Sequence, residues 1–404
     1  MKFQDYRIDS RIKSQLEYMG FKKPTDIQYR SIQHILDGED VMAVAPTGTG
    51  KTAAFVIPIL NHILKKKRRG AGVRALIMVP TRELAKQIAE VVDLISVNAG
   101  VSCLGLYGGV EQDQQIDALE NKLDVLVATP GRMFDLISQG YIDLSGIEYF
   151  VIDEADLMLD LGFNKDIRDV LRFLPKKRQT LFFTATINKK IKALAYDVVR
   201  HAIRIHVSPK NPVSKNVQHA VVYVEMDDKR FFLENLLKEF ETGKFIVFVR
   251  TKVRVERVVA AMKRVDINTE ALHGGIEQKD RFSILERFRL NKNKILITTD
   301  VACRGIDIPD MDYVINYDLP DNSENYVHRC GRTGRGNNKG HAISFCAENE
   351  KELLAEIEEY TGSEIERHDI RPEEYKDIIE ESDFNEKDWK KLLSDNSDSE
   401  SWKE

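Results

Sequence analysis

The chain has 404 residues and a net charge of −5, and with 42% hydrophobic and 31% charged residues its composition is typical of a globular protein and excludes a wholly disordered one. Because a single hydrophobic core stops growing at about 250 to 300 residues, the length predicts two domains. The acidic residues are concentrated: residues 364–404 hold 15 Asp and Glu against 7 Lys and Arg, a balance of −8, so the rest carries +3. Net charge therefore neither indicates nor excludes nucleic-acid binding.

No apolar run approaches the roughly 18 residues that a membrane-spanning helix needs, and the first residues lack the apolar core of a signal peptide. The four cysteines, at positions 103, 303, 330 and 346, form no Cys-x-x-Cys pair, which predicts free thiols in a reducing compartment. We therefore expect a cytoplasmic protein that does not enter a membrane.

Two helices are predicted before residue 40, because apolar residues recur at helical spacing over 11–19 and 27–36. If a phosphate site follows, this segment can select the base. The amide of Gln28 can donate to and accept from the edge of adenine, and Phe3 could stack on the ring. Taken alone, a glutamine in a helix is more often a surface residue.

A phosphate-loop signature follows. Residues 45–52 read Ala-Pro-Thr-Gly-Thr-Gly-Lys-Thr, after an apolar run and before an amphipathic one, which predicts a strand, a glycine-rich loop and a helix. Backbone N–H groups of such a loop and the N-terminus of the helix surround phosphates. Lys51 would reach the β- and γ-phosphates, and the Thr52 hydroxyl would ligate Mg²⁺. A glycine turn with an incidental Lys-Thr is the alternative, since Ala45 stands where the motif has its first glycine.

Two carboxylates follow a buried strand at residues 148–152. Asp153 and Glu154 lie at its carboxyl end, the edge at which open α/β sheets bind ligands. Asp153 can hold the metal ion that Thr52 holds, while Glu154 can polarise water. A solvated acidic loop is the alternative, but it does not explain carboxylates directly after a run of apolar residues.

Apolar runs alternate with amphipathic helices up to residue 207, which predicts a parallel sheet covered by helices. The predicted strands are 41–45, 74–79, 102–106, 124–128, 148–152, 179–183 and 202–206. Turns with small residues, hydroxyls and arginine follow several of them, at 80–83, 107–109, 129–132 and 184–186. Such groups suit phosphates and sugars better than base edges. Ordinary helix caps beside an arginine are the alternative for each turn taken singly.

After a Pro-bearing break at 207–213, the natural place for a hinge, the alternation restarts. Strands are expected near 219–224, 245–249, 269–272, 294–298, 312–316 and 341–346. No second phosphate loop follows. Instead, an aspartate and arginines spaced by three occur among glycines at 299–307 and 328–335. We interpret these residues as a cluster on loops that binds a polyphosphate. A solvated basic turn is the alternative. If the second domain closes on the first, Arg332 and Arg335 would act as arginine fingers.

These patterns divide the chain into four parts. We predict a nucleotide-binding domain over 1–207 that includes the adenine-reading segment, a linker at 208–213, and a second domain over 214–363. An acidic tail over 364–404 follows, which we expect to be mobile because it holds few apolar residues.

Taken together, these residues resemble the DEAD-box RNA helicase family over about residues 3–361. The motifs appear in family order: Phe3 and 20–28, 45–52, 80–85, 108–109, 129–132, 153–156, 184–186, 248–251, 278–281, 299–307 and 328–335. Each is weak alone, but the ordered combination is specific. The resemblance implies an α/β fold of two tandem RecA-like domains, each a mostly parallel sheet with helices on both faces, with ATP, Mg²⁺ and RNA bound across the cleft between the domains.

The resemblance also implies roles for residues. Catalysis is implied for Glu154, as the hydrolytic base, and for Lys51, Arg332 and Arg335. Nucleotide binding is implied for Phe3, Phe21, Gln28, Thr47, Gly48, Thr49, Gly50, Lys51, Thr52, Asp153, Gly305, Asp307, Arg332 and Arg335, with Thr52 and Asp153 on the metal, partly through water. RNA contact is implied for Pro80, Arg82, Gly108, Gly109, Thr129, Gly131, Arg132, Arg250, Thr251, Gly275, Arg281 and Thr299, and coupling between the sites for Asp156, Thr184, Thr186 and His328.

The departures from the family pattern are mild. Asp26, Thr184 and Cys330 replace the usual proline, serine and aliphatic residue, and Thr184 keeps the hydroxyl. The acidic tail differs more, since many relatives carry basic extensions that grip RNA. We therefore expect targeting by a partner protein rather than an RNA anchor in the tail.

We expect an ATP-dependent RNA helicase that hydrolyses ATP to unwind short duplexes locally or to remodel RNA–protein complexes. Its expected partners are single-stranded or short duplex RNA and proteins of ribonucleoproteins or RNA decay, and we expect it to act as a monomer. Two alternatives remain open: an ATP-gated RNA clamp with little unwinding, and a DNA helicase of the same superfamily.

Overall fold

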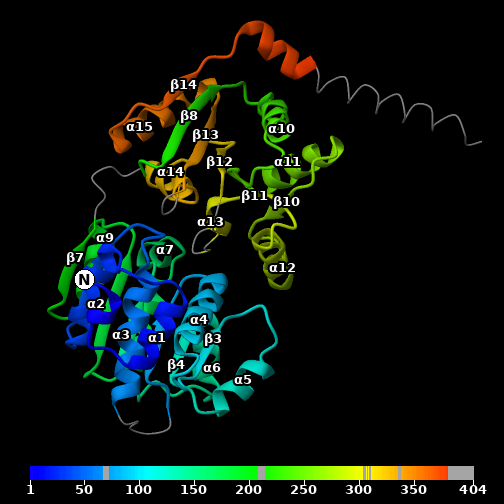
Figure 1. Ribbon diagram of the computed structural model, residues 1–404. Coiled ribbons are helices and arrows are strands. Elements are labelled where there is room, and N and C mark those ends of the chain that lie inside the picture. Colours follow the sequence, from blue (N-terminus) through cyan, green and yellow to red (C-terminus); the bar gives the residue numbers. More distant parts are fainter. Residues whose placement is uncertain are drawn as a thin grey trace, which may run out of the picture. The chain divides into compact units, whose positions relative to one another are not determined.

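The computed structural model describes residues 1–66, 72–207, 214–303, 306, 308, 311–334 and 338–380 (Figure 1). The chain divides into two compact units, of which the first includes Met1–Lys210 and the second holds most of the chain from Asn211 onward. The predicted linker at 208–213 lies outside the described residues. No helix in the described part of the chain is long and apolar enough to cross a membrane.

The first unit is built on a parallel sheet of seven strands in the order β3-β4-β2-β5-β6-β1-β7. The strands are β1 (Val41–Val44), β2 (Ala75–Met78), β3 (Cys103–Leu106), β4 (Val125–Ala128), β5 (Tyr149–Ile152), β6 (Gln179–Thr184) and β7 (Ile203–His206). Strands β1, β2, β4, β5 and β6 are buried at every position, because a parallel sheet covered by helices has two apolar faces.

Helices cover both faces of this sheet. The helices of the first unit are η1 (Phe3–Asp5), α1 (Ser10–Tyr18), α2 (Asp26–Leu36), α3 (Lys51–Lys65), α4 (Arg82–Ser96), α5 (Asp113–Glu120), α6 (Pro130–Ser138), α7 (Ala155–Asp160), α8 (Asn164–Val170) and α9 (Lys189–Val198). Val41 and Ala43 of β1 belong to a core shared with α1 to α4, while Met42 and Val44 belong to one shared with α6 to α9. Successive side chains of one strand thus enter opposite cores.

The second unit repeats the plan with a parallel sheet in the order β10-β11-β9-β12-β13-β8-β14. Its strands are β8 (Val217–Tyr223), β9 (Phe245–Phe248), β10 (Glu270–Leu272), β11 (Ile295–Thr298), β12 (Tyr313–Asn316), β13 (Gly340–Cys346) and β14 (Glu366–His368). Its helices are α10 (Lys229–Glu239), α11 (Lys252–Arg264), α12 (Gln278–Arg289), α13 (Asp300–Cys303), α14 (Ser323–Cys330), η2 (Glu348–Glu350) and α15 (Lys351–Thr361). The chain therefore has two tandem RecA-like units, as expected.

Residues after 363 add to the second sheet. Strand β14 pairs in parallel with β8, and a helix over 372–380 follows. Ile370, Tyr375 and Ile378 pack against the core of the second unit, and the Tyr375 hydroxyl donates to Asp228 Oδ2 at 2.8 Å. The first part of the predicted tail is thus ordered against the domain, which differs from the mobile segment expected there; residues 381–404 lie outside the described part.

Candidate functional site

Three predicted motifs meet at the carboxyl edge of the first sheet. Residues 45–52 follow β1, residues 153–156 follow β5, and residues 184–186 follow β6. Since β5, β6 and β1 are neighbours in the sheet, the parallel topology brings the motifs together. Ala45 N–H donates to the Thr184 carbonyl at 3.0 Å, which ties two of them directly.

The phosphate loop has the backbone that its glycines allow. Gly48 and Gly50 have φ angles of 76° and 88°, a region that a side chain disfavours, and α3 starts directly after Gly50. Lys51 is only 6% exposed, and its Nζ donates to the carbonyl of Ala45 at 2.9 Å. The Thr49 hydroxyl donates to the Pro46 carbonyl at 2.7 Å. The loop is therefore braced by its own side chains.

Gln28 is bound to this loop. Its Oε1 accepts from Thr25 N–H at 3.0 Å, and its Nε2 donates to the Gly50 carbonyl at 3.0 Å. A Cβ at Gly50 would lie 2.4 Å from Nε2, so the glycine also makes room for the amide. Gln28 is 3% exposed, which rules out the surface-residue alternative. The amide is thus in direct contact with the phosphate loop.

The two aromatic candidates differ in accessibility. Phe3 is 2% exposed and packs against Tyr6 and Phe21, with a ring-centroid distance of 6.0 Å to Phe21. Phe21 is only partly buried. Stacking on adenine by Phe3 itself would require the ring to leave the core. The geometry therefore favours Phe21 as the stacking ring and Phe3 as its support, which sequence spacing alone did not separate.

The carboxylates after β5 occupy contrasting environments. Asp153 is 3% exposed; burial raises the pKa of its carboxyl, while the Lys51 ammonium and the Glu154 N–H, 2.9 Å from Oδ1, act in the opposite direction. Glu154 is only partly buried and adopts φ 49° and ψ 50°, the left-handed region that non-glycine residues rarely enter. Asp153 is thus buried, whereas Glu154 is partly exposed.

Asp156 joins this segment to the turn after β6. Its Oδ2 accepts from the backbone N–H groups of Ala185 and Thr186, each at 3.1 Å, and from the Thr186 hydroxyl at 3.4 Å. The Thr184 hydroxyl donates to the Thr186 carbonyl at 2.9 Å. These hydrogen bonds join the segment after β5 to the turn after β6.

The donor set at this edge fits a magnesium ion. Mg²⁺ prefers oxygen ligands and is held by one or two protein oxygens together with nucleotide phosphates. Asp153 offers a carboxylate whose burial calls for compensating positive charge, and the Thr52 hydroxyl is partly exposed at the first turn of α3. No group of three or more His, Cys, Asp or Glu side chains suited to a metal ion occurs among the described residues.

The turns predicted to contact RNA gather at the other half of the same edge. They follow β2, β3 and β4, which are adjacent in the sheet. A Cβ built on Gly108 would lie 3.7 Å from the Arg82 guanidinium, so these two turns touch. Arg132 donates to the Gln115 side chain at 2.8 Å and to the Val110 carbonyl at 3.2 Å. Arg132 therefore shapes the loop after β3.

The same turns include the remaining candidates of the first unit. Thr129 is buried and caps α6, which begins with Pro130, while Gly131 is exposed in its first turn. Gly109 has a φ of 78°, and Pro80 ends the buried run that starts with β2. Thr47 is partly exposed in the phosphate loop. All of these lie at the carboxyl edge, as predicted.

In the second unit the candidates also follow adjacent strands, β10, β11 and β9. Thr251 caps α11 through its hydroxyl, which accepts from Arg254 N–H at 3.3 Å. Arg250, placed on RNA by the resemblance, bonds Glu350 at 3.1 Å, the Leu319 carbonyl at 3.2 Å and Asp321 at 3.3 Å. Its guanidinium is thus engaged within the domain.

The arginine cluster is not entirely borne by a loop. His328 and Arg329 lie in the last turn of α14, so the interpretation of 328–335 as a loop is wrong for its first residues. Arg329 donates to both carboxylate oxygens of Asp300, at 2.6 and 2.7 Å, while Arg332 is 5% exposed. Gly305, Asp307 and Arg335 lie outside the described residues.

A buried cluster of charged side chains next to Arg250 was not predicted from the sequence. Glu350 is 1% exposed and bonds Lys229, which is fully buried, as well as Arg250 and two backbone N–H groups. Asp318 pairs with Arg254 at 3.2 Å. The spacing of these residues along the chain does not predict that they contact one another. Asp300 and Arg329, by contrast, adjoin predicted site residues, and that adjacency was a usable signal.

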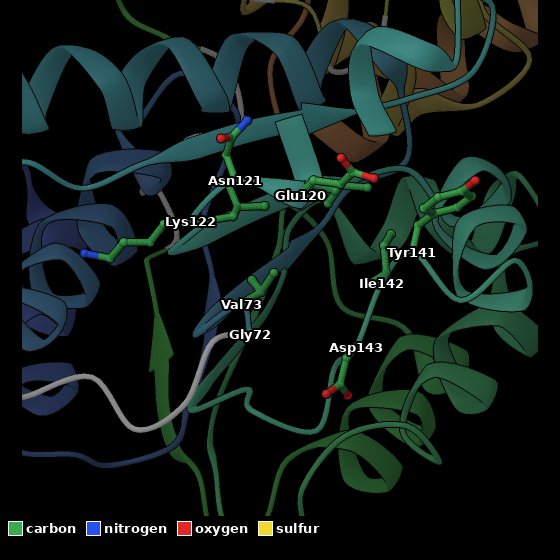
Figure 2. Close-up of a pocket in the computed structure, with 10 residues that line it drawn as sticks. Gly72, Val73, Glu120, Asn121, Lys122, Tyr141, Ile142 and Asp143 are labelled. Carbon is green, nitrogen blue, oxygen red and sulfur yellow. The ribbon is translucent and has the colours of Figure 1, made fainter. Parts of the chain in front are cut away.

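A pocket of about 470 Å³ lies away from these motifs. Figure 2 shows its lining, which comes from the end of α5 and from the loops that precede β2, β4 and β5: Gly72, Val73, Leu119, Glu120, Asn121, Lys122, Leu123, Tyr141, Ile142 and Asp143. These loops lie at the amino ends of parallel strands, opposite the edge that carries the motifs. No predicted site residue lines it, so we base the functional assignment on the strand ends.

Known proteins match the chain along most of its length. A DEAD/DEAH box helicase family model matches residues 25–194, and a helicase conserved C-terminal domain model matches residues 228–337. The ATP-dependent RNA helicase RhlB of Shewanella sediminis is 41% identical over 370 residues, with 90% of this chain and 85% of its own covered. The structure of S. cerevisiae Dbp5 bound to RNA and ADP BeF3 aligns with a TM-score of 0.83 at 30% identity, covering 96% of this chain and 99% of that one. The chain belongs to the DEAD/DEAH box helicase family.

Proposed function

We propose that this chain, an ATP-dependent RNA helicase of the DEAD/DEAH box family, uses ATP hydrolysis to unwind short RNA duplexes locally or to remodel RNA–protein contacts. The supporting observation is the shared sheet edge, where the nucleotide motifs follow β1, β5 and β6 while the RNA turns follow β2, β3 and β4. Binding at one half of this edge can therefore influence the other.

For hydrolysis, we propose that the phosphate loop, with Lys51, binds the β- and γ-phosphates. Thr52 and Asp153 would hold Mg²⁺, which supplies charge neutralisation of the phosphates when bound. Glu154 would accept the proton of the attacking water, whose oxygen bonds to the γ-phosphorus as the bond to ADP breaks. The partial exposure of Glu154, beside the buried Asp153, supports this division of roles.

For base recognition, we propose that Gln28 reads the adenine edge and that Phe21 stacks on its face, with Phe3 behind it. Gly305 and Asp307 are proposed to complete the nucleotide site, and Arg332 and Arg335 to contact the γ-phosphate as arginine fingers. His328 is proposed to couple the two sites, together with Asp156, Thr184 and Thr186.

For RNA, we propose that the turns of both units bind the phosphates and sugars of one strand. Backbone contacts of this kind fix a strand without reading its sequence, which suits an enzyme that acts on many short duplexes. We further propose a monomeric, cytoplasmic protein that is directed to its RNA by partners in ribonucleoproteins or RNA decay, since the acidic tail does not suit RNA.

The test is the steady-state ATPase rate with single-stranded RNA, with DNA of matched length and without nucleic acid. We expect strong stimulation by RNA and little by DNA, because 2′-hydroxyl contacts distinguish the two. Equal stimulation by DNA would contradict the RNA assignment. A strand-displacement assay on a short duplex completes the test, because a protein that binds RNA with ATP but displaces no strand would be a clamp.

A further inference from the structure

One histidine in the second unit lies between segments proposed to bind RNA. His273 directly follows β10 and is 6% exposed. In Figure 1, β10 runs beside β11, and α11 lies against both strands. Gly275, in the turn after β10, and Thr251, at the start of α11, are both proposed RNA contacts. His273 thus lies within reach of two of these segments.

Hydrogen bonds define the protonation of this imidazole. The backbone N–H of Gly275 donates to His273 Nδ1 at 3.1 Å, so Nδ1 carries no proton. The proton therefore lies on Nε2, which donates to Glu256 Oε1 of α11 at 2.6 Å. The imidazole, as the Nε2–H tautomer, joins the turn after β10 to α11.

The ring also lies close to the backbone of the turn. A Cβ at Gly275 would lie 3.2 Å from His273 Nδ1 and 3.3 Å from Cε1, a tight contact, whereas a Cβ at Gly274 would meet nothing within 4 Å. The imidazole therefore packs directly against the backbone of Gly275. The peptide N–H of that residue is turned toward the ring.

The Arg281 side chain also binds the backbone of this turn. Its guanidinium donates to the His273 carbonyl at 3.1 Å and to the Ala302 carbonyl at 3.2 Å, and the side chain is 8% exposed. Ala302 lies in α13, which begins immediately after Thr299, another proposed RNA contact. His273 and Arg281 together connect the three segments that follow β9, β10 and β11.

We infer that His273, as the Nε2–H tautomer held by Glu256, is a positioning residue for RNA: it fixes the backbone of the Gly274–Gly275 turn through its Nδ1 acceptor. The inference rests on the proposed RNA-binding function and deepens it. RNA affinity then depends on an acceptor at one defined place, and not on the bulk or charge of the side chain.

Two substitutions separate the two ring nitrogens. In His273→Asn, the amide oxygen lies near the place of Nδ1 and can still accept from Gly275 N–H. In His273→Gln, the longer amide reaches the place of Nε2 and can still donate to Glu256, but nothing accepts from Gly275. If His273 acted only by filling space, the two variants would follow side-chain volume, and His273→Gln would bind RNA better than His273→Asn.

The measurement is the RNA dependence of the ATPase, read as KM for RNA and kcat, with the RNA-independent rate and thermal stability recorded for each variant. We expect His273→Gln to raise KM for RNA by about fivefold, the ratio that corresponds to one backbone hydrogen bond, with kcat nearly unchanged. We expect His273→Asn to stay within roughly twofold of wild type. His341→Gln is the matched control, since His341 is an exposed histidine of the same unit.

The outcomes are distinct. Equal KM values for the Asn and Gln variants, or a larger loss for Asn, would overturn the positioning role. Losses that follow thermal stability in both variants would also overturn it, in favour of a packing role. If the wild-type ATPase does not respond to RNA at all, the proposed function itself fails, which the wild-type measurement reports separately.

Discussion

At the scale of single residues, the most informative backbone is that of Glu154. Its φ of 49° costs an L-amino acid roughly 1–2 kcal/mol, and such strain is kept where the surrounding structure requires it. Here the neighbours on both sides are fixed, since Asp153 is buried and Asp156 is bound to the turn after β6. The strained backbone belongs to Glu154, the residue whose side chain is proposed to activate water.

This strain can be measured with two variants that both lack the carboxylate. We expect Glu154→Gly to be more stable to urea than Glu154→Ala by about 1 kcal/mol, because glycine enters the left-handed region freely whereas alanine does not. Both should lose most ATPase activity. The reverse order of stability would show that the residue is not strained, and Ala155→Gly, at a helical position nearby, provides the control in which glycine should destabilise.

His219 makes a second prediction at this scale. Burial lowers the pKa of its imidazole to about 4, Nδ1 lies 2.9 Å from the Tyr326 hydroxyl, and Nε2 is buried without a partner. A histidine in the unfolded chain titrates near pH 6.5, so the unfolded state binds the proton first as pH falls. The second unit should therefore lose stability between about pH 6.5 and pH 4, by up to about 1.4 kcal/mol per pH unit.

The measurement is urea unfolding of wild type and His219→Asn across this range. The asparagine can still accept from Tyr326 but does not titrate, so the part of the pH dependence that belongs to His219 should disappear. A wild-type stability that is flat from pH 6.5 to pH 4, or unchanged pH dependence in the variant, would contradict the assignment.

At the scale of elements, strand β14 and the helix over 372–380 extend the second unit beyond its predicted end. The Tyr375 ring lies 4.8 Å from that of Phe232, and its hydroxyl accepts from Glu225 N–H at 3.1 Å while donating to Asp228. Glu366–His368 completes the sheet beside β8. These contacts cover an apolar surface that would otherwise meet water.

Two truncations test this role. Ending the chain after residue 380 should leave the stability of the second unit unchanged, because the contacts with Phe232 and β8 remain. Ending it after residue 363 should destabilise the unit by roughly 2–4 kcal/mol, through exposure of apolar area and of a paired strand edge. Full-length Tyr375→Ala should reproduce part of the loss. Equal stability of the two truncated proteins would mean that residues 364–380 do not stabilise the second unit.

The sequence predicted most elements because their signal is local. Thirteen strand predictions coincide with β1 to β13, and several of these strands, among them β1, β2 and β5, are apolar runs buried at every position. Strand β14 was missed because Glu-Arg-His has no apolar pattern, and only its pairing with β8 makes it a strand. The cluster around Glu350 was missed for the same reason, since Lys229 and Glu350 are 121 positions apart.

The functional residues divide in a similar way. Lys51, Asp153 and Gln28 are predicted as site residues because a motif surrounds each, and the structure brings Gln28 and Lys51 to one loop. The roles within the motifs were not accessible: burial separates Phe3 from Phe21, and internal hydrogen bonds engage Arg250 and Arg132. Spacing along a chain shows which residues share a motif, but not which of them face outward.

At the scale of the whole molecule, each unit has a sheet edge that carries its proposed contacts. In the first unit that edge offers both nucleotide and RNA motifs, whereas in the second it offers RNA segments on β9, β10 and β11. The chain thus contains two copies of one architecture with one phosphate loop. The second copy is free to supply arginines and backbone turns in place of a second nucleotide site.

The hydrogen bonds of Lys51 and Gln28 bear on the rate at which the enzyme can release ADP. Each side chain already has a partner within the protein, the Ala45 and Gly50 carbonyls, so a nucleotide gains only the difference between two hydrogen bonds. If both side chains bind the nucleotide as proposed, the lysine and the glutamine regain these partners when ADP departs, instead of being left unsatisfied. Such exchange favours moderate affinity and rapid turnover, and it makes occupancy follow the ratio of ATP to ADP in the surroundings. The enzyme would then slow as that ratio falls, without any separate regulatory site.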